Sequence, residues 1–545
     1  MKSRTGEVPL TGVALAVSLV LAAGLVVYPL ASLFGRAFQA GAEPFQRAFS
    51  GLVLLAVLHT LWASGIATAL AVVLAAALAV ATERSPAIGR HWLRLGVSLP
   101  ILIPPFISAF SWTQAYGRAG LLDKLVHVWW GGVFGAPGTV ALLAVQSLPL
   151  VYLPLAAALS SHHTQDLERA ARISGAGFGT MLRTVTLPLL RPYLLAGAAL
   201  AYVVSASDFG VPSVVGLPGR FSTVTTEIYR DMAFATNPAN FATVIVLAAF
   251  LVALALAVLL VLRQPVLDAV IAAGSARHDT PRTSQHFGAL PVLVTAAVGL
   301  WVALVSLFPL AAMLLVALIR AYGLPIVPEN LTFLHFNQAL QGDGALALIR
   351  SAVLALLAAT IVMAIGLAVA LAARRGPLGR FTEVIVALPY AIPGSAMAVA
   401  IILGFSRWLY GTFAIILLAY VGRFWALGSR PIAAALSQLA PDPVRAARIS
   451  GAAAWRSFWT GAWPAVRPAA AAAWLLVFLT VIHELTVSSL LYTPDTQTVA
   501  VVVLNAEQGG DVARTAAISV LLTAIVLLVA IPAVALRTRV QAAAR

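Results

Sequence analysis

Two stretches of this chain have nearly the same sequence: ERAARISGAGFGTMLRTVTLPLLRP at residues 168–192 and VRAARISGAAAWRSFWTGAWPAVRP at residues 444–468. Every position of the first copy has its counterpart in the second at one constant offset, without a gap. Both copies are polar and rich in arginine, although 61% of the chain is hydrophobic. A charged segment repeated between apolar runs predicts a membrane protein of two fused halves, each presenting the same element to water.

The composition points to lipid as the solvent. Only 10% of the 545 residues are charged, against about 25% in soluble domains. The net charge of +15 does not indicate nucleic-acid binding, because the basic residues sit in short gaps between apolar runs rather than on one face. The absence of cysteine excludes disulfides and thiolate metal sites.

A transmembrane helix needs about 20 mostly apolar residues, and the chain contains about twelve such runs. We therefore expect an all-α, polytopic fold. The expected spans are 10–34, 52–82, 95–116, 138–160, 193–216 and 241–262 in the first half, and 290–320, 349–373, 384–406, 410–430, 469–492 and 515–537 in the second.

The duplication extends beyond the first pair of stretches. LPILIPP at 99–105 matches LPYAIPG at 388–394, at a larger offset than that of the first pair. We expect two halves, 1–280 and 281–545, related by a parallel repeat because each holds about six spans. The first repeated segment (residues 164–192) and the second repeated segment (residues 440–468) occupy matching places. The offset of the two repeated segments is smaller than that of the LPILIPP and LPYAIPG pair, which precedes them. We therefore expect the first half to carry extra residues within 116–138.

The distribution of arginine and lysine predicts the orientation. If the N-terminus lies inside, the inner segments hold most of the 34 basic residues. Both termini, the polar linker at 263–287 and both repeated segments are then cytoplasmic, in a bacterial inner membrane. Each repeated segment should form a short helix, a turn at Gly175 or Gly451, and a second short helix closed by Pro188 or Pro464.

At these residues the chain resembles the EAA loop of ABC importer permeases. In that family the loop forms a coupling helix that docks in a groove of the ATPase subunit. Positions matching the family pattern are Ala170, Ala171, Gly175, Ala446, Ala447 and Gly451, whereas Arg169 and Arg445 replace the family's glutamate. The resemblance implies that the ATPase-coupling residues are Arg169, Ala170, Ala171, Gly175, Pro188, Arg445, Ala446, Ala447, Gly451 and Pro464.

No motif for catalysis is apparent. Neither of the two lysines, Lys2 and Lys124, lies in a phosphate-binding P-loop. We expect a transport subunit that is not an enzyme and holds no cofactor. ATP and magnesium would bind to two copies of a separate ATPase, and a periplasmic binding protein would deliver the solute to the outer stretches 217–241 and 492–511.

Ionisable groups inside a bilayer are candidates for a transport path. Asp208 and Glu484 lie in predicted spans and correspond at the same offset as the repeated segments, and His483 is adjacent to Glu484. Gly210 and Pro212 should break the fifth span beside Asp208. One interpretation places these three side chains on the substrate path, with His483 joining the acids. The other makes each acid a helix cap or the partner of a local arginine.

The residues SDFG at 207–210 and HELTVSSLLY at 483–492 resemble ferric-iron permeases of the ABC superfamily. The resemblance implies iron(III) as the solute, and carboxylates suit a hard cation. Thiamine or another small solute is the alternative, and a secondary transporter is the alternative class. No residue is assigned as a metal ligand with certainty.

Overall fold

The computed structural model describes residues 8–85, 87–234, 238–262, 290–373, 389, 392–437, 439 and 442–543. Throughout these ranges the regular structure is helical, and the only β-type pairing is an isolated bridge between Ile319 and Leu331. The predicted all-α fold is confirmed. The linker at 263–287 and most of the stretch that repeats 83–90, at 373–380, lie outside the described residues.

The first half contains helices on both sides of the first repeated segment. They are α1 (Val8–Ala22), α2 (Tyr28–Gln39), α3 (Ala42–Ala48), α4 (Gly51–Glu83), α5 (Arg90–Ser98), α6 (Pro105–Tyr116), α7 (Leu121–Val126), α8 (Ala136–Ser160), α9 (His162–Ile173), α10 (Phe178–Met181), α11 (Leu187–Ser207), α12 (Val224–Phe234) and α13 (Pro238–Val261).

The second half follows the same order. Its helices are α15 (Leu290–Val302), α16 (Phe308–Leu318), α17 (Leu334–Ala339), α18 (Gly342–Ala373), α20 (Gly394–Leu409), α21 (Phe413–Ser437), α22 (Asp442–Ile449), α23 (Ala454–Ser457), α24 (Trp463–Ile482), α25 (Ser488–Leu491), α26 (Val499–Gln508) and α27 (Val512–Ala543).

Among the described residues, 10 helices are long and apolar enough to cross a membrane, or 11 if one bent pair counts as a span. That pair, Arg90–Ile101 and Pro105–Val126, bends by 102° where the predicted span 95–116 contains two prolines in succession. The shorter apolar helix α20 (Gly394–Leu409) overlaps the predicted span 384–406. Each predicted span therefore has a helical counterpart.

π-helical turns recur at matching places in the two halves. One pair interrupts the first span of each half: η1 (Ala23–Val27) and η6 (Ala303–Leu307). Another pair, η3 (Leu182–Thr186) and η8 (Phe458–Ala462), joins α10 to α11 and α23 to α24. Because these turns are uncommon inside helices, their shared positions indicate that the duplication extends to irregular backbone.

Each half is built on three helices that pack together, α4, α8 and α11 in the first and α18, α21 and α24 in the second. Small residues allow the close approach that membrane helices use. A Cβ added to Gly366 of α18 would lie 2.8 Å from the backbone of α21 at Gly428. One added to Gly197 of α11 would lie 2.9 Å from the backbone of α8 at Val151.

The first helices of each half pack against the other half. Helix α1 packs against α18 and α2 against α20, while α15 packs against α5 and α16 against α6. The two halves are therefore interlocked rather than placed side by side. A shared apolar core, containing residues from both halves, follows from this exchange.

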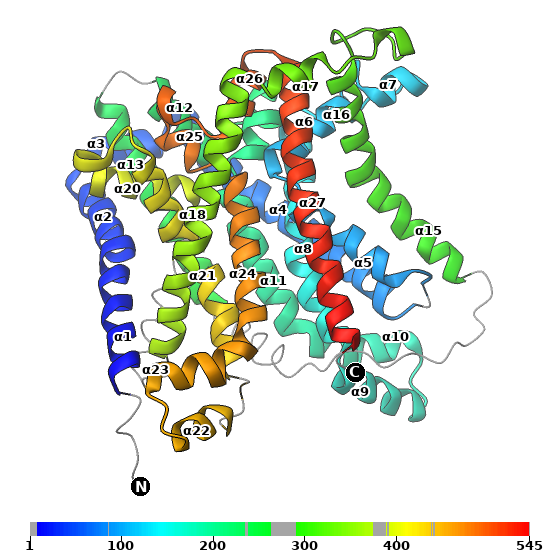
Figure 1. Cartoon of the computed structure of the whole chain (residues 1–545). Coiled ribbons are helices and arrows are strands. Elements are labelled where there is room, and N and C mark those ends of the chain that lie inside the picture. Colours follow the sequence, from blue (N-terminus) through cyan, green and yellow to red (C-terminus); the bar gives the residue numbers. More distant parts are fainter. Residues whose placement is uncertain are drawn as a thin grey trace.

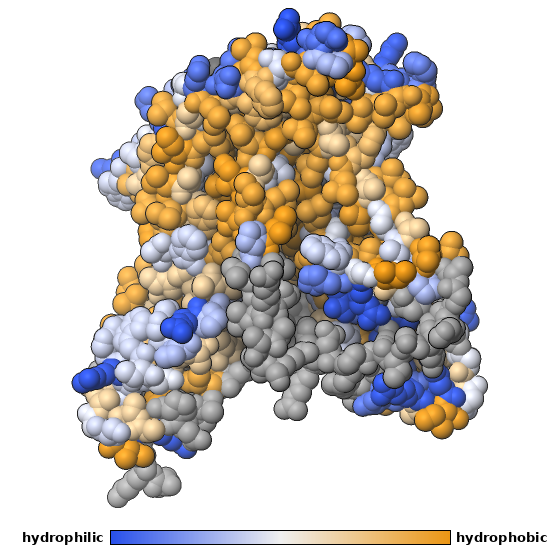
Figure 2. Space-filling view, turned by 45° about the vertical axis from the view of Figure 1, so that its right-hand side comes forward, coloured by the Kyte–Doolittle hydropathy of each residue, from blue (hydrophilic) through white to orange (hydrophobic). Residues whose placement is uncertain are grey.

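The two ends of the molecule are distinct. Helices α9, α10, α22 and α23 lie at one end, where α1 also begins and α27 ends (Figure 1). Helices α7, α12, α17 and α26 lie at the opposite end (Figure 1). An apolar band separates polar side chains at these ends on the face shown in Figure 2. The two repeated segments, the start of α1 and the end of α27 thus lie at the same end of the molecule.

The extra residues of the first half lie where the sequence placed them. Between α6 and α8 the chain runs through residues 117–135 and forms α7, whereas only residues 410–412 join α20 to α21. Trp130 packs edge-on against Trp112, with ring centroids 6.3 Å apart. The insertion is thus held against the end opposite to the repeated segments.

Candidate functional site

The first repeated segment ends its helix with a glycine turn. Helix α9 stops at Ile173, and Gly175 has a left-handed backbone with φ of +84°. The amide of Ala176 donates to the Ala171 carbonyl and that of Gly175 to the Arg172 carbonyl, both at 3.0 Å. This pair of bonds is a Schellman motif, which favours glycine because a Cβ would strain this conformation.

The second repeated segment repeats this geometry. Gly451 has a φ of +83°, the Ala452 amide donates to the Ala447 carbonyl, and the Gly451 amide donates to the Arg448 carbonyl. Both distances are again 3.0 Å. The prediction of a helix followed by a turn at Gly175 and Gly451 is confirmed.

Each turn presents one exposed apolar side chain. Ile173 and Ile449 are each 88% exposed, the highest exposure among the described large hydrophobic side chains. Arg169, Arg445, Ala170 and Ala446 are also exposed, while Ala171 and Ala447 are half-buried. The two halves thus share an exposed isoleucine at the same place in each repeated segment.

Ile173 and Ile449 were missed by sequence reasoning. The available signal was an apolar residue two positions before each turn glycine. Exposure could not be read from the sequence, because the periodicity of one short helix does not say which face is covered.

Pro188 and Pro464 do not close a short helix, and here the sequence prediction was wrong. Each stands at the second position of a membrane helix, α11 or α24, directly after η3 or η8. The π-helical turn accommodates the proline, which has no backbone N–H to donate. The helix therefore continues from the repeated segment into the membrane.

Two membrane spans break at the predicted acids. Helix α11 ends at Ser207 and α24 at Ile482. The amide of Val211 donates to Asp208 Oδ1 at 2.7 Å, and the amide of Val487 donates to the Glu484 carboxylate at 2.9 and 3.0 Å. Each acid therefore accepts the backbone amide of the residue three positions later, where the chain turns into the short helix after the break.

Arg423 was missed by sequence reasoning. Its Nη1 lies 2.6 Å from Glu484 Oε1, and the two side chains are 19% and 5% exposed. The guanidinium also lies over the ring of Phe424 and against Gly394. One arginine of the second half thus pairs with Glu484, and its counterpart at the offset of the repeated segments is Ser147.

His483 does not take the place that was expected for it. Its Nδ1 is buried and has no hydrogen-bond partner among the described residues, so this atom links neither acid. Arg423 is the residue that pairs with Glu484 instead. Its separation from Glu484 along the chain left no local sequence signal for the pair.

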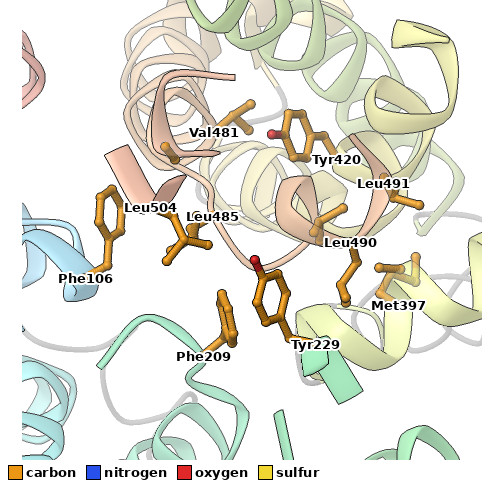
Figure 3. Close-up of a cluster of buried hydrophobic side chains, with 14 of the residues drawn as sticks. Phe106, Phe209, Tyr229, Met397, Tyr420, Val481, Leu485, Leu490, Leu491 and Leu504 are labelled. Atoms are coloured by element: carbon orange, nitrogen blue, oxygen red, sulfur yellow. The ribbon is translucent and has the colours of Figure 1, made fainter. Parts of the chain in front are cut away.

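Apolar side chains from both halves converge beside the two breaks (Figure 3). The rings of Phe209 and Tyr229 lie 4.8 Å apart, and Leu485, Leu490 and other buried residues surround them. The labelled members of this group are Phe106, Phe209, Tyr229, Met397, Tyr420, Val481, Leu485, Leu490, Leu491 and Leu504. We call these ten side chains the central apolar cluster.

The two predicted outer stretches meet. Tyr229 Oη of α12 lies 3.5 Å from Gln508 Oε1 of α26, so residues from both halves form this surface. Glu227 is almost fully buried and is paired with Arg230. Burial raises the pKa of Glu227, and it raises the pKa of Glu507 to about 7.

Within the described ranges, no group of three or more histidine, cysteine, aspartate or glutamate residues could hold a metal ion. Both acids at the breaks are instead engaged by backbone amides, and Glu484 is also paired with Arg423.

A family model described as "Binding-protein-dependent transport system inner membrane component" matches residues 68–269 and 360–545. The chain belongs to this family. It is therefore a multi-pass inner membrane permease, a transport subunit and not an enzyme. Permeases of this class work with ATPase and binding-protein partners, and the secondary-transporter alternative no longer applies.

The chain is similar over most of its length to named permeases. It is 24% identical to the ferric transport system permease protein of Actinobacillus pleuropneumoniae, over 89% of this chain and 72% of that protein. It is 26% identical to a probable ABC transporter permease protein of Sinorhizobium fredii, over 89% of both chains. A shorter match, 32% over 145 residues, is to the molybdenum transport system permease protein of Escherichia coli, covering 26% of this chain and 63% of that protein.

The pair between Arg423 and Glu484 leads to a stability prediction for the permease. Arg423→Gln or Glu484→Gln alone leaves a buried charge without its partner, so we expect each to lower the free energy of unfolding by roughly 3 kcal/mol. The double variant should recover most of that loss. Asp208→Asn is the control, because asparagine caps a helix about as well as aspartate. Denaturation of the purified permease measures all four, and additive losses in the double variant would contradict the pairing.

Glu507 predicts a dependence on pH. Its pKa of about 7 in the folded protein lies above the ordinary 4.5, so the folded state holds a proton that the unfolded state releases between these values. The free energy of unfolding should therefore fall as pH rises from about 4.5 to about 7.

Glu507→Gln removes the group that titrates. We therefore expect the variant to raise the melting temperature at pH 8 and to change it little at pH 4.5. Thermal unfolding at both pH values measures the difference. An equal change at the two values would show that Glu507 titrates normally.

Proposed function

We propose that this chain is the permease of an importer for iron(III), driven by two copies of a separate ATPase. The main support is similarity to ferric transport permeases over 89% and 77% of this chain. The pairing of interrupted spans with carboxylates at the breaks suits a path for a cation. A periplasmic binding protein would deliver the solute to the surface formed by α12 and α26.

The end that carries α9 and α22 would face the cytoplasm. Arginines are frequent in both repeated segments, and the positive-inside rule favours this orientation. ATP and magnesium would bind to the ATPase subunits, each of which would receive one repeated segment. Closure of the ATPases would move the two segments together, and the interlocked first helices would transmit that motion to both halves.

The residues proposed to carry the coupling are those of the two repeated segments. Ile173 and Ile449 would enter apolar sites on the ATPase, while Arg169 and Arg445 would lie at the polar rim of each contact. Gly175 and Gly451 would set the direction of the chain after the contact, and Pro188 and Pro464 would start the membrane helices that receive the motion.

The proposed path runs between Asp208 and Glu484. The central apolar cluster fills the space beside these acids, so transport requires this cluster to move. Arg423 neutralises part of the negative charge there, and a cation would compete with it for the carboxylates.

Molybdenum transport is the second candidate. The 32% match to a molybdenum permease and the presence of Arg423 beside the breaks favour it, because a guanidinium suits an oxyanion such as molybdate. The substrate can therefore be decided by the sign of the transported charge.

Substitution of the two isoleucines tests the docking surface. Because both side chains are 88% exposed, Ile173→Asp with Ile449→Asp should leave the melting temperature of the permease unchanged. We expect the variant to lose co-purification of the ATPase, at least about tenfold, because a charge would be buried in each contact. Phe333→Asp, at an exposed site between α16 and α17, is the control and should assemble normally. Normal assembly of the isoleucine variant would reject these contacts.

Uptake by the reconstituted complex tests the substrate. Vesicles holding the permease, its ATPase and its binding protein should accumulate radiolabelled iron(III) only with ATP, and should not accumulate labelled molybdate. Asp208→Asn should reduce iron uptake severalfold without reducing assembly, because the cap is kept while the charge is lost. Accumulation of molybdate in place of iron would transfer the assignment to the second candidate.

A further inference from the structure

The first repeated segment is held by a buried ion pair. Glu168 of α9 lies 2.8 Å from Nε of Arg84, and their side chains are 7% and 8% exposed. The hydroxyl of Thr186, in η3, donates to Glu168 at 2.9 Å. The carboxylate therefore points into the protein and is not available on the exposed face of the segment.

Arg84 connects this carboxylate to the membrane helices. It follows directly after α4, and its Nη1 donates to the Leu159 carbonyl near the end of α8 at 2.6 Å. The guanidinium thus joins α4, α8 and α9, while Thr186 adds the start of the helix that continues into α11. A planar guanidinium with several fixed donors allows one geometry for this junction.

Neighbouring residues extend the polar contacts. Glu83, at the last position of α4, pairs with Arg94 of α5, and the Thr82 hydroxyl lies 2.9 Å from Tyr152 Oη of α8. Side-chain ion pairs and hydrogen bonds therefore join α4 to α5 and α8 at the end of the first half that carries the repeated segment.

The second half has apolar residues at the matching positions. In the alignment of the two repeated segments, Glu168 and Thr186 correspond to Val444 and Ala462. In the alignment of 83–90 with 373–380, extended by one residue, Thr82 and Glu83 correspond to Ala372 and Ala373. Arg374, the counterpart of Arg84, lies outside the described residues. None of the four described counterparts can accept or donate a side-chain hydrogen bond.

Apolar contacts hold the second repeated segment. Val444 packs against a cluster that includes Ile432, Leu436, Ala462 and Val466. Such contacts are non-directional, so the segment can shift slightly without losing a specific bond. The glycine turns of the two segments are nevertheless the same, which confines the difference to the way each segment is anchored.

We propose that Arg84, Glu168 and Thr186 form a clamp that fixes the first repeated segment rigidly to α4 and α8, whereas the second repeated segment is compliant. The two ATPase contacts then transmit motion unequally: the first half follows its ATPase closely and the second half lags. The three residues are positioning residues, because they act through the segment and do not touch solute. This inference rests on the proposed coupling role of both segments.

Amide hydrogen exchange on the full complex in lipid nanodiscs measures the rigidity directly. At equivalent positions, we expect residues 169–173 to exchange at least about tenfold more slowly than residues 445–449. Exchange without nucleotide requires no ATPase motion, so the result does not depend on the proposed function. Equal exchange rates in the two segments would overturn the proposal.

A matched variant transfers the apolar anchor to the first half. Arg84→Met, Glu168→Val and Thr186→Ala together replace the buried ions with apolar side chains, a change that proteins often tolerate without loss of stability. We expect exchange at 169–173 to rise to the rate of 445–449, and solute transported per ATP hydrolysed to fall severalfold while ATPase binding persists. Full coupling in this variant would show that the ion pair is only structural.

Two further variants keep the test decisive if the triple variant does not fold. Thr186→Val removes one hydrogen bond and should speed exchange at 169–173 a few-fold, and Thr186→Ser should restore protection. Val444→Ala, in the second segment, should leave exchange at 169–173 unchanged. If Thr186→Val has no effect on exchange, the clamp is rejected. Loss of the proposed function would appear separately, as retained ATPase binding in the isoleucine variant.

Discussion

A span that breaks within the membrane leaves backbone N–H groups without helical partners where the next helix begins, and this fold supplies a carboxylate for them twice. Asp208 and Glu484 accept the amides of Val211 and Val487 in the same register. An isolated carboxylate at that depth would itself be costly. Arg423 neutralises Glu484 directly, so the break in the span, the acid and the arginine form one unit. The central apolar cluster packs beside this unit, and the interlocked halves meet around it.

The two halves match more closely in backbone conformation than in side-chain chemistry. The glycine turns, the π-helical turns before α11 and α24, and the capped breaks all recur at the same offset. Two of the buried charges do not recur: Arg423 corresponds to Ser147, and Glu168 corresponds to Val444. Two symmetric backbones therefore carry two different sets of electrostatic contacts. This separation explains why the acids alone, read as a symmetric pair, gave an incomplete picture of the site.

Much of the fold could be predicted because its determinants are local. Apolar runs of membrane length gave the spans, and the glycine after RAARIS gave both turns. The break beside Gly210 was also predictable, since glycine and proline disfavour a continued helix there. Arg423 and Arg84 were not predictable, because their partners lie 61 and 84 residues away along the chain and only the packed helices bring them together. Pro188 and Pro464 misled the sequence analysis because a π-helical turn, which has no sequence signature of its own, accommodates each proline.

Fusion of the halves into one chain is what permits this asymmetry. In a permease of two identical subunits, an arginine at the position of Arg423 would appear twice, and two guanidinium groups would face the same pair of acids. Their mutual repulsion would cost free energy in a medium of low dielectric constant. Within a single chain, one half can supply the arginine that pairs with Glu484 and the other half a serine, so no second guanidinium is forced on the same site. The same freedom lets an ion pair anchor one repeated segment while valine and alanine anchor the other. The physical consequence is a pseudo-symmetric protein whose two halves share a framework for movement but differ in the strength and direction of the contacts that hold it.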